Sequence, residues 1–332
     1  INPFAKRMFK MLTLSNFYTN DILKLFSDKF TGVDVKASFE KSKETNFYEI
    51  PEIDSENKIY KVKFTLINNE KDKKYSLIWI EDITESKILE RKKSEFVSVV
   101  AHQLRTPLSG IKWTLKMLLT GDLGVLTDDQ KSFVGKAYDS NDRMISLIND
   151  MLNVDRIVSG RLQYFFVNIQ FLDLVESVIY ELMPFANKRK VTISFKEKPA
   201  ILAPIFIDPE KMRAVVQNLI ENAIKYTKAE GSIRVILTEK SDTIYFEVQD
   251  NGIGVPPAEQ TNIFTRFFRS TNAVRVQTDG SGLGLFISKS IIETHHGTIG
   301  FKSELGKGSS FYFEIPKQFK NNVTTNNNVV SK

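Results

Sequence analysis

The chain has 332 residues, of which 42% are hydrophobic and 26% are charged, as in an ordinary globular protein of two or three domains. Its formal net charge of +6 is spread along the chain, so a nucleic-acid partner is not expected. The absence of cysteine excludes disulfides, thiol catalysis and Cys-ligated metals, and three histidines are too few for a histidine-rich metal site.

No stretch reaches the roughly 18 uncharged apolar residues of a membrane span, and no signal peptide opens the chain. The first residue is Ile1 rather than Met, as in a fragment or a processed chain, and attachment to a membrane through an upstream segment stays open. Residues 1–30 predict one or two short amphipathic helices. A helix packed on its own domain explains their apolar face better than a helix lying on a membrane.

From Phe47 on, the hydrophobic period changes to two. The apolar members of the clearest alternation are Tyr60, Val62, Phe64 and Leu66. This alternation predicts a half-buried strand, and the polar stretch NNEKDKK predicts a hairpin loop before a second strand, YSLIWIED. Residues 1–85 are therefore expected to form a small α+β domain.

The stretch SEFVSVVAHQLRTPLSGIKWTLKMLL carries one apolar stripe with steps of three and four residues, which predicts a long amphipathic helix. His102 lies about 200° round that helix from Val100 and Leu104, so its side chain should face solvent. A lone exposed histidine is usually an ordinary surface residue, and its role depends on the rest of the chain. Because no Pro or Gly separates this helix from the preceding domain, the helix is expected to transmit rotation or a change of register.

A second long helix should follow the turn GDLG, with Thr127 and Gln130 as its capping box. The apolar stripe of this helix consists of Phe133, Ala137, Met144, Leu147, Ile148 and Met151. Residues 86–158 thus predict an antiparallel helical hairpin. One hairpin buries only one side of each stripe, so we expect a homodimer in which two hairpins form a four-helix bundle.

Residues 159–317 alternate between helix and strand patterns and predict an α/β domain. One helix is expected from Asp208-Pro209, as N-cap and first helical residue, to about Thr227. His295 and His296 end a later helix, where a favourable interaction with the helix dipole is expected. The Asn-rich tail, residues 318–332, is expected to be disordered.

Three features of residues 208–315 together indicate a nucleotide site. Asn218 and Asn222 share one helical face, where carboxamide oxygens can bind a hard cation such as Mg²⁺. Asp250 ends a strand before the glycines of DNGIGVPP, a position suited to accept a hydrogen bond from the amino group of a base. The glycines of DGSGLGLFISKSI precede a helix, where free N–H groups bind anions. Each feature alone is weak evidence, but three in this order within one α/β unit are strong evidence.

Between the second and third features, IFTRFFRS predicts a mobile lid anchored by Phe264, Phe267 and Phe268. Arg266 and Arg269 would then lie within reach of phosphate. At least one of these phenylalanines is expected to be an ordinary core residue.

These motifs resemble those of the two-component sensor histidine kinases. AHQLRTPLSGIKWTL is similar to that family's H box, and NLIENAIKYT, DNGIGVPP, IFTRFFRS and GSGLGLFISKSI are similar to its N box, first glycine box, F box and second glycine box. The resemblance covers residues 86–316 in the family's order. It implies the ATP-binding α/β sandwich shared with gyrase and Hsp90, and a dimeric hairpin that carries the phosphorylated histidine. Residues 1–85 resemble a PAS sensor much more loosely.

The resemblance implies ATP and Mg²⁺ as cofactors, a response-regulator receiver domain as partner, and a cytoplasmic location or the cytoplasmic part of a membrane-anchored kinase. His102 would be the phosphoacceptor, with Gln103 and Thr106 beside it, and Asn222, with Asn218, would bind the metal. The nucleotide would be bound by Asn218, Asn222, Lys225, Tyr226, Asp250, Gly252, Gly254, Phe264, Arg266, Arg269, Gly280, Gly282, Leu283, Gly284 and Ser309. Asn218 stands where gyrase-like ATPases keep a water-activating Glu, and an amide cannot act as that base.

Gln103 departs from the acidic residue that commonly follows the family's histidine. A neutral amide cannot take the imidazole proton, so a slower kinase is expected. Thr106 matches the position linked to dephosphorylation of the regulator, and Pro107 deprives the Gln103 carbonyl of its helical partner, which allows a bend. A phosphatase-dominant or weak kinase, a gyrase-like ATPase and a non-catalytic dimeric scaffold are the alternatives. Residues 1–85 lack Cys and His, which excludes a cysteinyl-flavin adduct and a His-ligated haem. Whether one subunit phosphorylates itself or its mate is left open.

Overall fold

The computed structural model describes residues 47–55, 58–68, 74–277 and 280–318. The helices expected in residues 1–30 and the disorder expected after Gln318 lie outside these ranges. The chain divides into two compact units between Phe96 and Val97. Within the described ranges, no helix is both long and apolar enough to cross a membrane.

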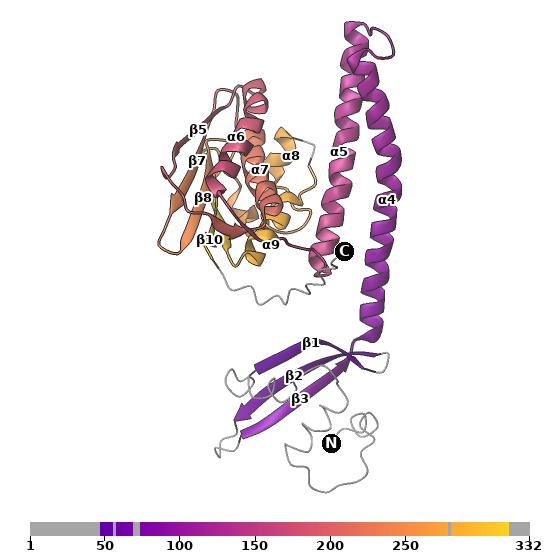
Figure 1. The fold of residues 1–332 in the computed structure, drawn as a ribbon, viewed down its shortest axis with the longest axis vertical. Coiled ribbons are helices and arrows are strands. Elements are labelled where there is room, and N and C mark those ends of the chain that lie inside the picture. The colour runs from indigo at the N-terminus through magenta and orange to yellow at the C-terminus, as the bar shows by residue number, and fades with distance from the viewer. Residues whose placement is uncertain (1–46, 56–57, 69–73, 278–279, 319–332) are drawn as a thin grey trace, which may run out of the picture. The chain divides into compact units, whose positions relative to one another are not determined.

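The first unit contains an antiparallel sheet in the order β1-β2-β3 (Figure 1). Its strands are β1 (Phe47–Ser55), β2 (Lys58–Asn68) and β3 (Lys74–Asp82). The predicted alternation is confirmed on β2, where Tyr60, Val62 and Phe64 are buried while Lys61 and Lys63 are only partly covered. The side chain of Leu66 lies outside the described part of the strand.

Helix α4 (Thr84–Thr120) begins where the Thr84 N–H and hydroxyl donate to Oδ1 of Asp82, and it continues through Pro107 without a break. Pro107 has no N–H with which to satisfy the Gln103 carbonyl. One residue earlier, the Thr106 hydroxyl lies 3.4 Å from the carbonyl of His102, a back-bond of the kind that bends helices. The helix is therefore locally weakened next to His102.

Helix α5 (Asp128–Val158) starts with the predicted capping box, in which Thr127 and Gln130 exchange hydrogen bonds of 3.0 and 3.3 Å. It runs antiparallel to α4 (Figure 1), which confirms the helical hairpin. Asn141 of α5 is 2% exposed and donates through Nδ2 to the carbonyl of Leu108 at 2.9 Å. Three residues earlier on α4, Arg105 donates to Oδ1 of Asn149 on α5 at 2.8 Å. The hairpin is thus held by polar contacts as well as by packing.

Part of the predicted apolar stripe stays uncovered in the single hairpin. Five of its members are between 44 and 49% exposed, namely Leu104, Ile111, Met144, Leu147 and Met151. A row of large apolar side chains at this exposure is typical of a surface that packs against another chain.

The α/β domain has a sheet in the order β5-β7-β8-β10-β9, with only the β5–β7 pair parallel. The strands are β5 (Thr192–Glu197), β7 (Ser232–Glu239), β8 (Thr243–Asp250), β9 (Thr298–Glu304) and β10 (Gly308–Pro316). The helices are α6 (Phe171–Lys188), α7 (Pro209–Tyr226), α8 (Thr271–Val276) and α9 (Gly284–Thr294), with a 3-10 turn η1 (Pro257–Asn262). A small sheet pairs β4 (Val167–Ile169) with β6 (Ile205–Ile207).

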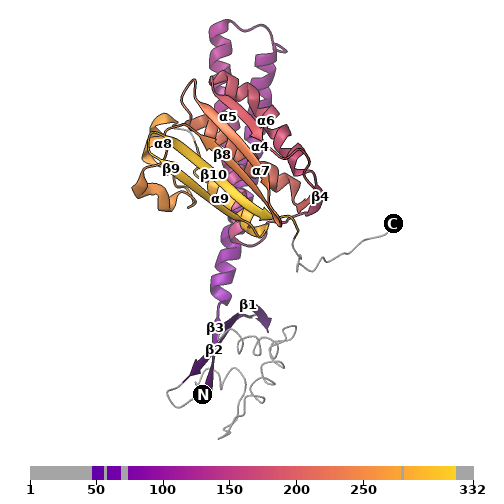
Figure 2. The same cartoon turned by 90° about the vertical axis from the view of Figure 1, so that its left-hand side faces the viewer.

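Helices α6, α7 and α9 cover one face of the large sheet, as seen in Figures 1 and 2. On β8, Ile244, Phe246 and Val248 point into the buried layer, while the side chains between them are only partly covered. Phe313 and Phe171 complete an aromatic cluster with Phe246. The layer between sheet and helices is the domain's core, and the predicted α/β sandwich is confirmed.

His295 is fully buried at the C-terminal end of α9, where its ring makes edge contacts with the rings of Tyr164 and Phe166. Its Nδ1 lies 2.8 Å from the Ile291 carbonyl, and its Nε2 accepts from the backbone N–H of Asp208 at 3.0 Å. Burial lowers the pKa of His295, so the ring is neutral near pH 7. The expected interaction of a charged imidazole with the helix dipole is therefore wrong for His295, whose ring instead holds the N-cap residue of α7.

Replacing His295 with Phe should preserve the aromatic packing but leave the buried Asp208 N–H without an acceptor. We expect the free energy of unfolding to fall by about 1–3 kcal/mol, measured by urea denaturation at pH 7.5. The buried ring takes up a proton at lower pH than the unfolded chain does, so wild-type stability should fall as pH drops below about 6.5. Part of that loss should vanish in His295→Phe. If the pH dependence of stability is the same in His295→Phe as in the wild type, His295 does not have a lowered pKa in the folded protein.

Candidate functional site

The second unit contains a cavity of about 730 Å³ beside α7, a size typical of small-molecule sites. Side chains of α5, α7 and α9 line it, together with the loops after β8 and before α9. The predicted site residues that line it are Asn218, Asn222, Lys225, Tyr226, Asp250, Gly254, Arg269, Gly280, Gly282, Gly284 and Ser309. The predicted nucleotide-binding residues outside the lining are Gly252, Phe264, Arg266 and Leu283.

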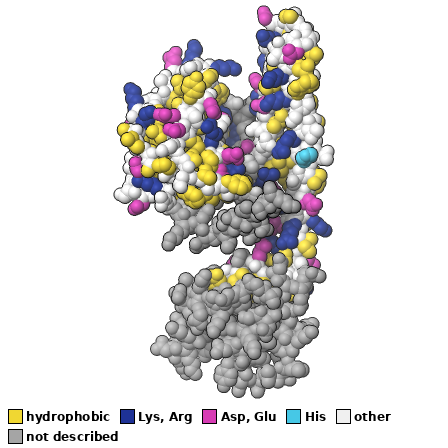
Figure 3. Space-filling model, in the orientation of Figure 1, with side chains coloured by type: hydrophobic (Ala, Val, Ile, Leu, Met, Phe, Trp, Pro, Cys, Tyr) yellow, Lys and Arg dark blue, Asp and Glu magenta, His cyan; other side chains and the backbone are white. Residues whose placement is uncertain are grey.

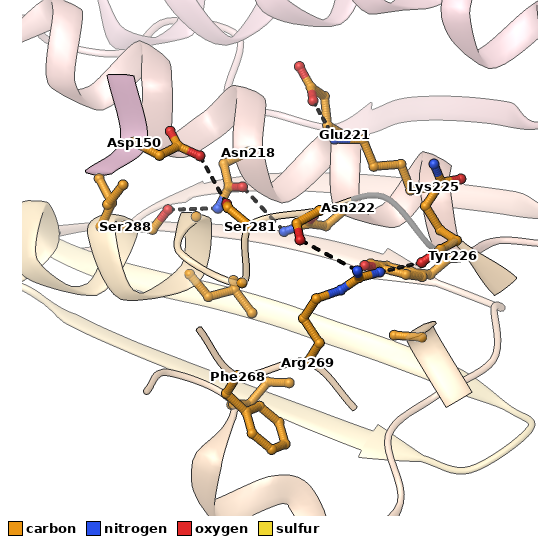
Figure 4. Close-up of a pocket in the computed structure, with 18 of the residues that line it drawn as sticks. Asp150, Asn218, Glu221, Asn222, Lys225, Tyr226, Phe268, Arg269, Ser281 and Ser288 are labelled. Carbon is orange, nitrogen blue, oxygen red and sulfur yellow. Dashed lines mark hydrogen bonds and ion pairs between the residues drawn. The ribbon is translucent and has the colours of Figure 1, made fainter. Parts of the chain in front are cut away.

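Helix α7 presents Asn218, Asn222 and Lys225 to the cavity because they recur at steps of four and three on one face (Figure 4). Nδ2 of Asn222 lies 3.4 Å from Oδ1 of Asn218, and Lys225 is paired with Glu221 at 2.7 Å. The donor set is two carboxamides beside a carboxylate that already has a partner. It fits a Mg²⁺ ion that brings phosphate and water ligands of its own, rather than an all-protein cage.

Asp250 lies at the end of β8, and its Oδ1 accepts from the backbone N–H groups of Gly252 at 2.8 Å and Ser309 at 3.3 Å. Burial raises the pKa of Asp250 to about 6, against the lowering effect of these two bonds. At neutral pH the group is an ionised, largely desolvated acceptor. Such a carboxylate binds a neutral N–H donor strongly, because water competes poorly for it.

Gly252 holds the turn after Asp250 close to α7. A Cβ at this position would lie 2.4 Å from the carbonyl oxygen of Tyr226, so no larger residue fits without a shift of the backbone. Gly252 therefore shapes the cavity from outside its lining. The glycines of the second loop, Gly280, Gly282 and Gly284, lead directly into the first turn of α9, where unpaired N–H groups can bind an anion.

The predicted lid residues separate into two groups. Phe264 packs edge to face on Phe301 of β9, 5.9 Å between centroids, so it is an anchoring residue that does not reach the cavity. Arg266 is exposed and lies over the ring of Phe286. Arg269 does line the cavity, and its guanidinium donates to the carbonyls of Gln277 and Gly280. Of the two predicted phosphate-binding arginines, only Arg269 is at the cavity.

Two polar residues with informative contacts, Asp150 and Ser288, are among the lining residues that were not identified from the sequence. Asp150 of α5 accepts from the Ser281 hydroxyl in the glycine loop at 2.9 Å, and burial raises the pKa of Asp150. Ser288 of α9 accepts from Nδ2 of Asn218 at 2.9 Å. Both contacts join segments that are far apart in sequence, and neither residue carries a local pattern that marks it. In the sequence, only the position of Ser281 between Gly280 and Gly282 of the glycine loop pointed to one of these contacts, the hydrogen bond to Asp150.

His102 is exposed on α4, as predicted. Figure 3 shows Lys and Arg side chains interspersed with hydrophobic ones along the hairpin. Gln103 and Thr106 are also exposed. None of the three lines the cavity. In this conformation an accessible imidazole and a nucleotide-sized cavity are therefore present in the same unit but are not joined.

Comparison with known proteins separates the hairpin that carries His102 from the α/β domain that carries most of the cavity. Residues 92–160 match the family model "His Kinase A (phospho-acceptor) domain", and residues 207–318 match "Histidine kinase-, DNA gyrase B-, and HSP90-like ATPase". The chain belongs to the two-component histidine kinases. The two matches fall on the hairpin and on the α/β domain.

Relatives of this histidine kinase include the sensor protein kinase WalK of Staphylococcus haemolyticus, 34% identical over 71% of this chain and 39% of the relative. The adaptive-response sensory kinase SasA of Synechococcus sp. JA-3-3Ab is 36% identical over 68% of this chain and 59% of the relative. The chain thus spans less than two thirds of the relatives it matches. Full-length ShkA, solved in complex with AMPPNP, aligns with a TM-score of 0.56 at 29% identity, covering 68% of this chain and 46% of that one.

Replacing Asp250 with Asn should separate binding from stability. The amide oxygen can still accept from Gly252 and Ser309, whereas the charge that burial disfavours is gone, so the unliganded protein should be at least as stable at pH 7. Loss of a charge-assisted hydrogen bond, about 1.5–3 kcal/mol, should weaken adenine-nucleotide binding by roughly 10- to 150-fold.

Calorimetric titration and thermal unfolding of both proteins test this prediction. Wild-type affinity should also fall as pH drops through about 6, where Asp250 takes up a proton, and the variant should lose that dependence. Tight nucleotide binding by Asp250→Asn would contradict the role given to this carboxylate.

Proposed function

We propose that the chain is an ATP-dependent protein-histidine kinase that phosphorylates His102 and passes the phosphoryl group to an aspartate of a response-regulator receiver domain. The observation that supports this most directly is the cavity formed by α7, Asp250 and the glycine loop, in the same chain as the exposed His102. In this proposal Asp250 accepts from the adenine amino group, and the N–H groups before α9 bind phosphate. Asn222 would hold Mg²⁺ together with the phosphates, and the ion would neutralise part of their charge.

In the phosphoryl transfer, the unprotonated ring nitrogen of His102 bonds to the γ-phosphorus, and the bond to the ADP oxygen breaks. The imidazolium formed then releases its other N–H proton. Gln103 carries an amide that cannot take this proton, so exposed His102 releases it to water. Because catalysis of this reaction consists mainly of positioning and charge stabilisation, such a site is slower but not inactive.

The uncovered row on the hairpin supports a homodimer. Two hairpins packed along Leu104, Ile111, Met144, Leu147 and Met151 would bury this row in a four-helix bundle. The receiver domain of the regulator would then meet His102 on the outside of the bundle, with Thr106 beside it for the reverse, dephosphorylating reaction. A PAS-type sensor before α4 and attachment to a membrane upstream belong to the same proposal. The three-stranded sheet of the first unit is compatible with the former.

One alternative has a specific observation in its favour, namely a phosphatase-dominant protein with weak kinase activity, which Gln103 supports. A gyrase-like ATPase is not favoured, because Asn218 is an amide bonded to Ser288 and Asn222 and cannot activate water as a base.

Incubation with γ-labelled ATP and Mg²⁺ tests the proposed activity. The wild type should acquire label that is acid-labile and alkali-stable, and His102→Gln should acquire none, because only the imidazole forms the phosphoramidate bond. His296→Gln is the matched control, a histidine variant outside the cavity lining that should label normally. Label that survives His102→Gln, or free phosphate without labelled protein, would sink the proposal.

Replacing Gln103 with Glu would place a carboxylate beside His102 that can take the imidazole proton. Autophosphorylation should then accelerate, with general-base catalysis contributing up to about 10²-fold. Initial rates of label incorporation across pH 6–9 provide the measurement. The gain in rate should be largest at the pH values at which removal of the imidazole proton limits the wild-type rate. If Gln103→Glu is no faster than the wild type, Gln103 does not limit autophosphorylation.

A further inference from the structure

Arg189 makes two hydrogen bonds that join separate elements of the α/β domain. It is the partly buried C-cap residue of α6. Its Nη1 donates to the backbone carbonyl of Lys225 on α7 at 2.7 Å, and its Nη2 donates to Oε1 of Gln277, directly after α8, at 2.9 Å. A guanidinium carries donors and no acceptor, so the direction of both bonds is certain. Arg189 thus connects three segments that are far apart in the sequence.

The first of these bonds satisfies the C-terminal end of α7. The last carbonyl groups of a helix have no partner within the helix, and a cation close to them is favourable. Because α7 ends at Tyr226, the Lys225 carbonyl belongs to this group, and Arg189 gives it a charged donor. The next carbonyl, that of Tyr226, accepts from the N–H of Ile253 at 3.2 Å. The end of α7 is therefore held both by α6 and by the loop after β8.

The second bond holds Gln277, a residue that lines the cavity. The backbone N–H of Gln277 donates to the carbonyl of Ala273 at 2.9 Å, which ends α8. Its backbone carbonyl accepts from Nη2 of Arg269, the predicted phosphate-binding arginine that lies at the cavity (Figure 4). A shift of the main chain at Gln277 would therefore also move the guanidinium of Arg269.

The guanidinium of Arg189 is itself held by α6. It lies over the ring of Phe185, one turn earlier, with 5.6 Å between Cζ and the ring centroid. Phe185 in turn packs against the core of the domain. Only a planar group with several nitrogens can stack in this way and donate to two separate acceptors, so a lysine would reproduce the charge but not the arrangement.

We propose that Arg189 is a positioning residue that holds Gln277 against the end of α7 and thereby keeps Arg269 in place for the phosphates of the nucleotide. Arg189 does not line the cavity and acts through these neighbours. The inference rests on the proposed function and adds a residue to it. Because Arg269 would meet an anionic group, the effect of Arg189 should depend on the phosphates of the ligand and not on its base, which Asp250 is proposed to bind.

The test compares the binding of a non-hydrolysable ATP analogue, with Mg²⁺, to the binding of adenosine. Titration calorimetry is carried out on the full chain. Arg189→Gln should lower the affinity for the ATP analogue about tenfold, the lower end of the loss expected from one charge-assisted hydrogen bond. Its affinity for adenosine should stay within about twofold of wild type. Lys188→Gln removes the same charge from an exposed neighbour and should bind both ligands as the wild type does.

Two further variants test whether Arg189 acts through Gln277. Gln277→Ala should also weaken binding of the ATP analogue, but in the Arg189→Gln background it should add less than about twofold, because the shared bond is already lost. Arg189→Lys keeps the charge without the planar fork and should fall between Arg189→Gln and the wild type. Gln277→Ala and Arg189→Lys also provide a readout if Arg189→Gln does not fold.

Wild-type affinity for the ATP analogue in both Arg189→Gln and Arg189→Lys would overturn the inference. Equal loss of affinity for the ATP analogue and for adenosine would also overturn it, because that pattern reports only a structural role. Additive losses from Arg189→Gln and Gln277→Ala would show that the two residues act independently. If the wild type binds no ATP analogue, the proposed function itself fails and the inference fails with it. Wild-type binding together with unaltered Arg189 variants means that the inference alone fails.

Discussion

The arrangement of the site depends on the apolar contact between α7 and the sheet. Met212, Val215 and Ile220 of α7 are completely buried against the layer that Phe246 of β8 helps to form. At about 1.5–3 kcal/mol for each large apolar side chain removed from water, this contact fixes the rotation of the helix about its axis. The opposite face, which carries the polar side chains of the N box, is thereby directed into the cavity. The cap at Asp208, held by His295, sets where that face begins along the chain.

Sequence reasoning located the parts of the site that depend on short-range pattern. The period of α4 and α5 predicted the hairpin and the exposure of His102, and the alternation on β8 predicted a strand that ends at Asp250. Contacts between distant segments could not be predicted in this way. Phe264 was expected among the nucleotide-binding residues as an anchor of the lid, but its ring packs on Phe301, on a strand that follows it by more than 30 residues. The carboxylate of Asp150 and the hydroxyl of Ser288 were missed because their partners lie on other elements and neither spacing nor composition marks them.

The cavity holds two carboxylates that burial makes costly to ionise, Asp250 and Asp150. Asp250 accepts from two backbone N–H groups and Asp150 accepts from one serine hydroxyl. Among the described residues, neither carboxylate accepts a hydrogen bond from a Lys or Arg side chain. Such groups lower the stability of the empty protein at neutral pH and interact strongly with a donor that arrives. The two carboxylates thus reduce the folding stability of the unliganded protein and favour binding of a ligand with N–H groups. The hydrogen bond of Asp150 also links the glycine loop to the hairpin helix that follows His102 in the chain.

The single hydrogen bond from buried Asn141 to the carbonyl of Leu108 limits how the hairpin can move. Sliding α4 along α5 by two residues, about 3 Å, would take that carbonyl out of reach and leave a buried amide nitrogen without its acceptor. Bending at Pro107 or twisting of the pair can preserve the bond, because the carbonyl lies close to the bend. Asn141 therefore fixes the register of α4 against α5. This favours signalling by bending or rotation of the helices over signalling by a piston-like displacement along their axes.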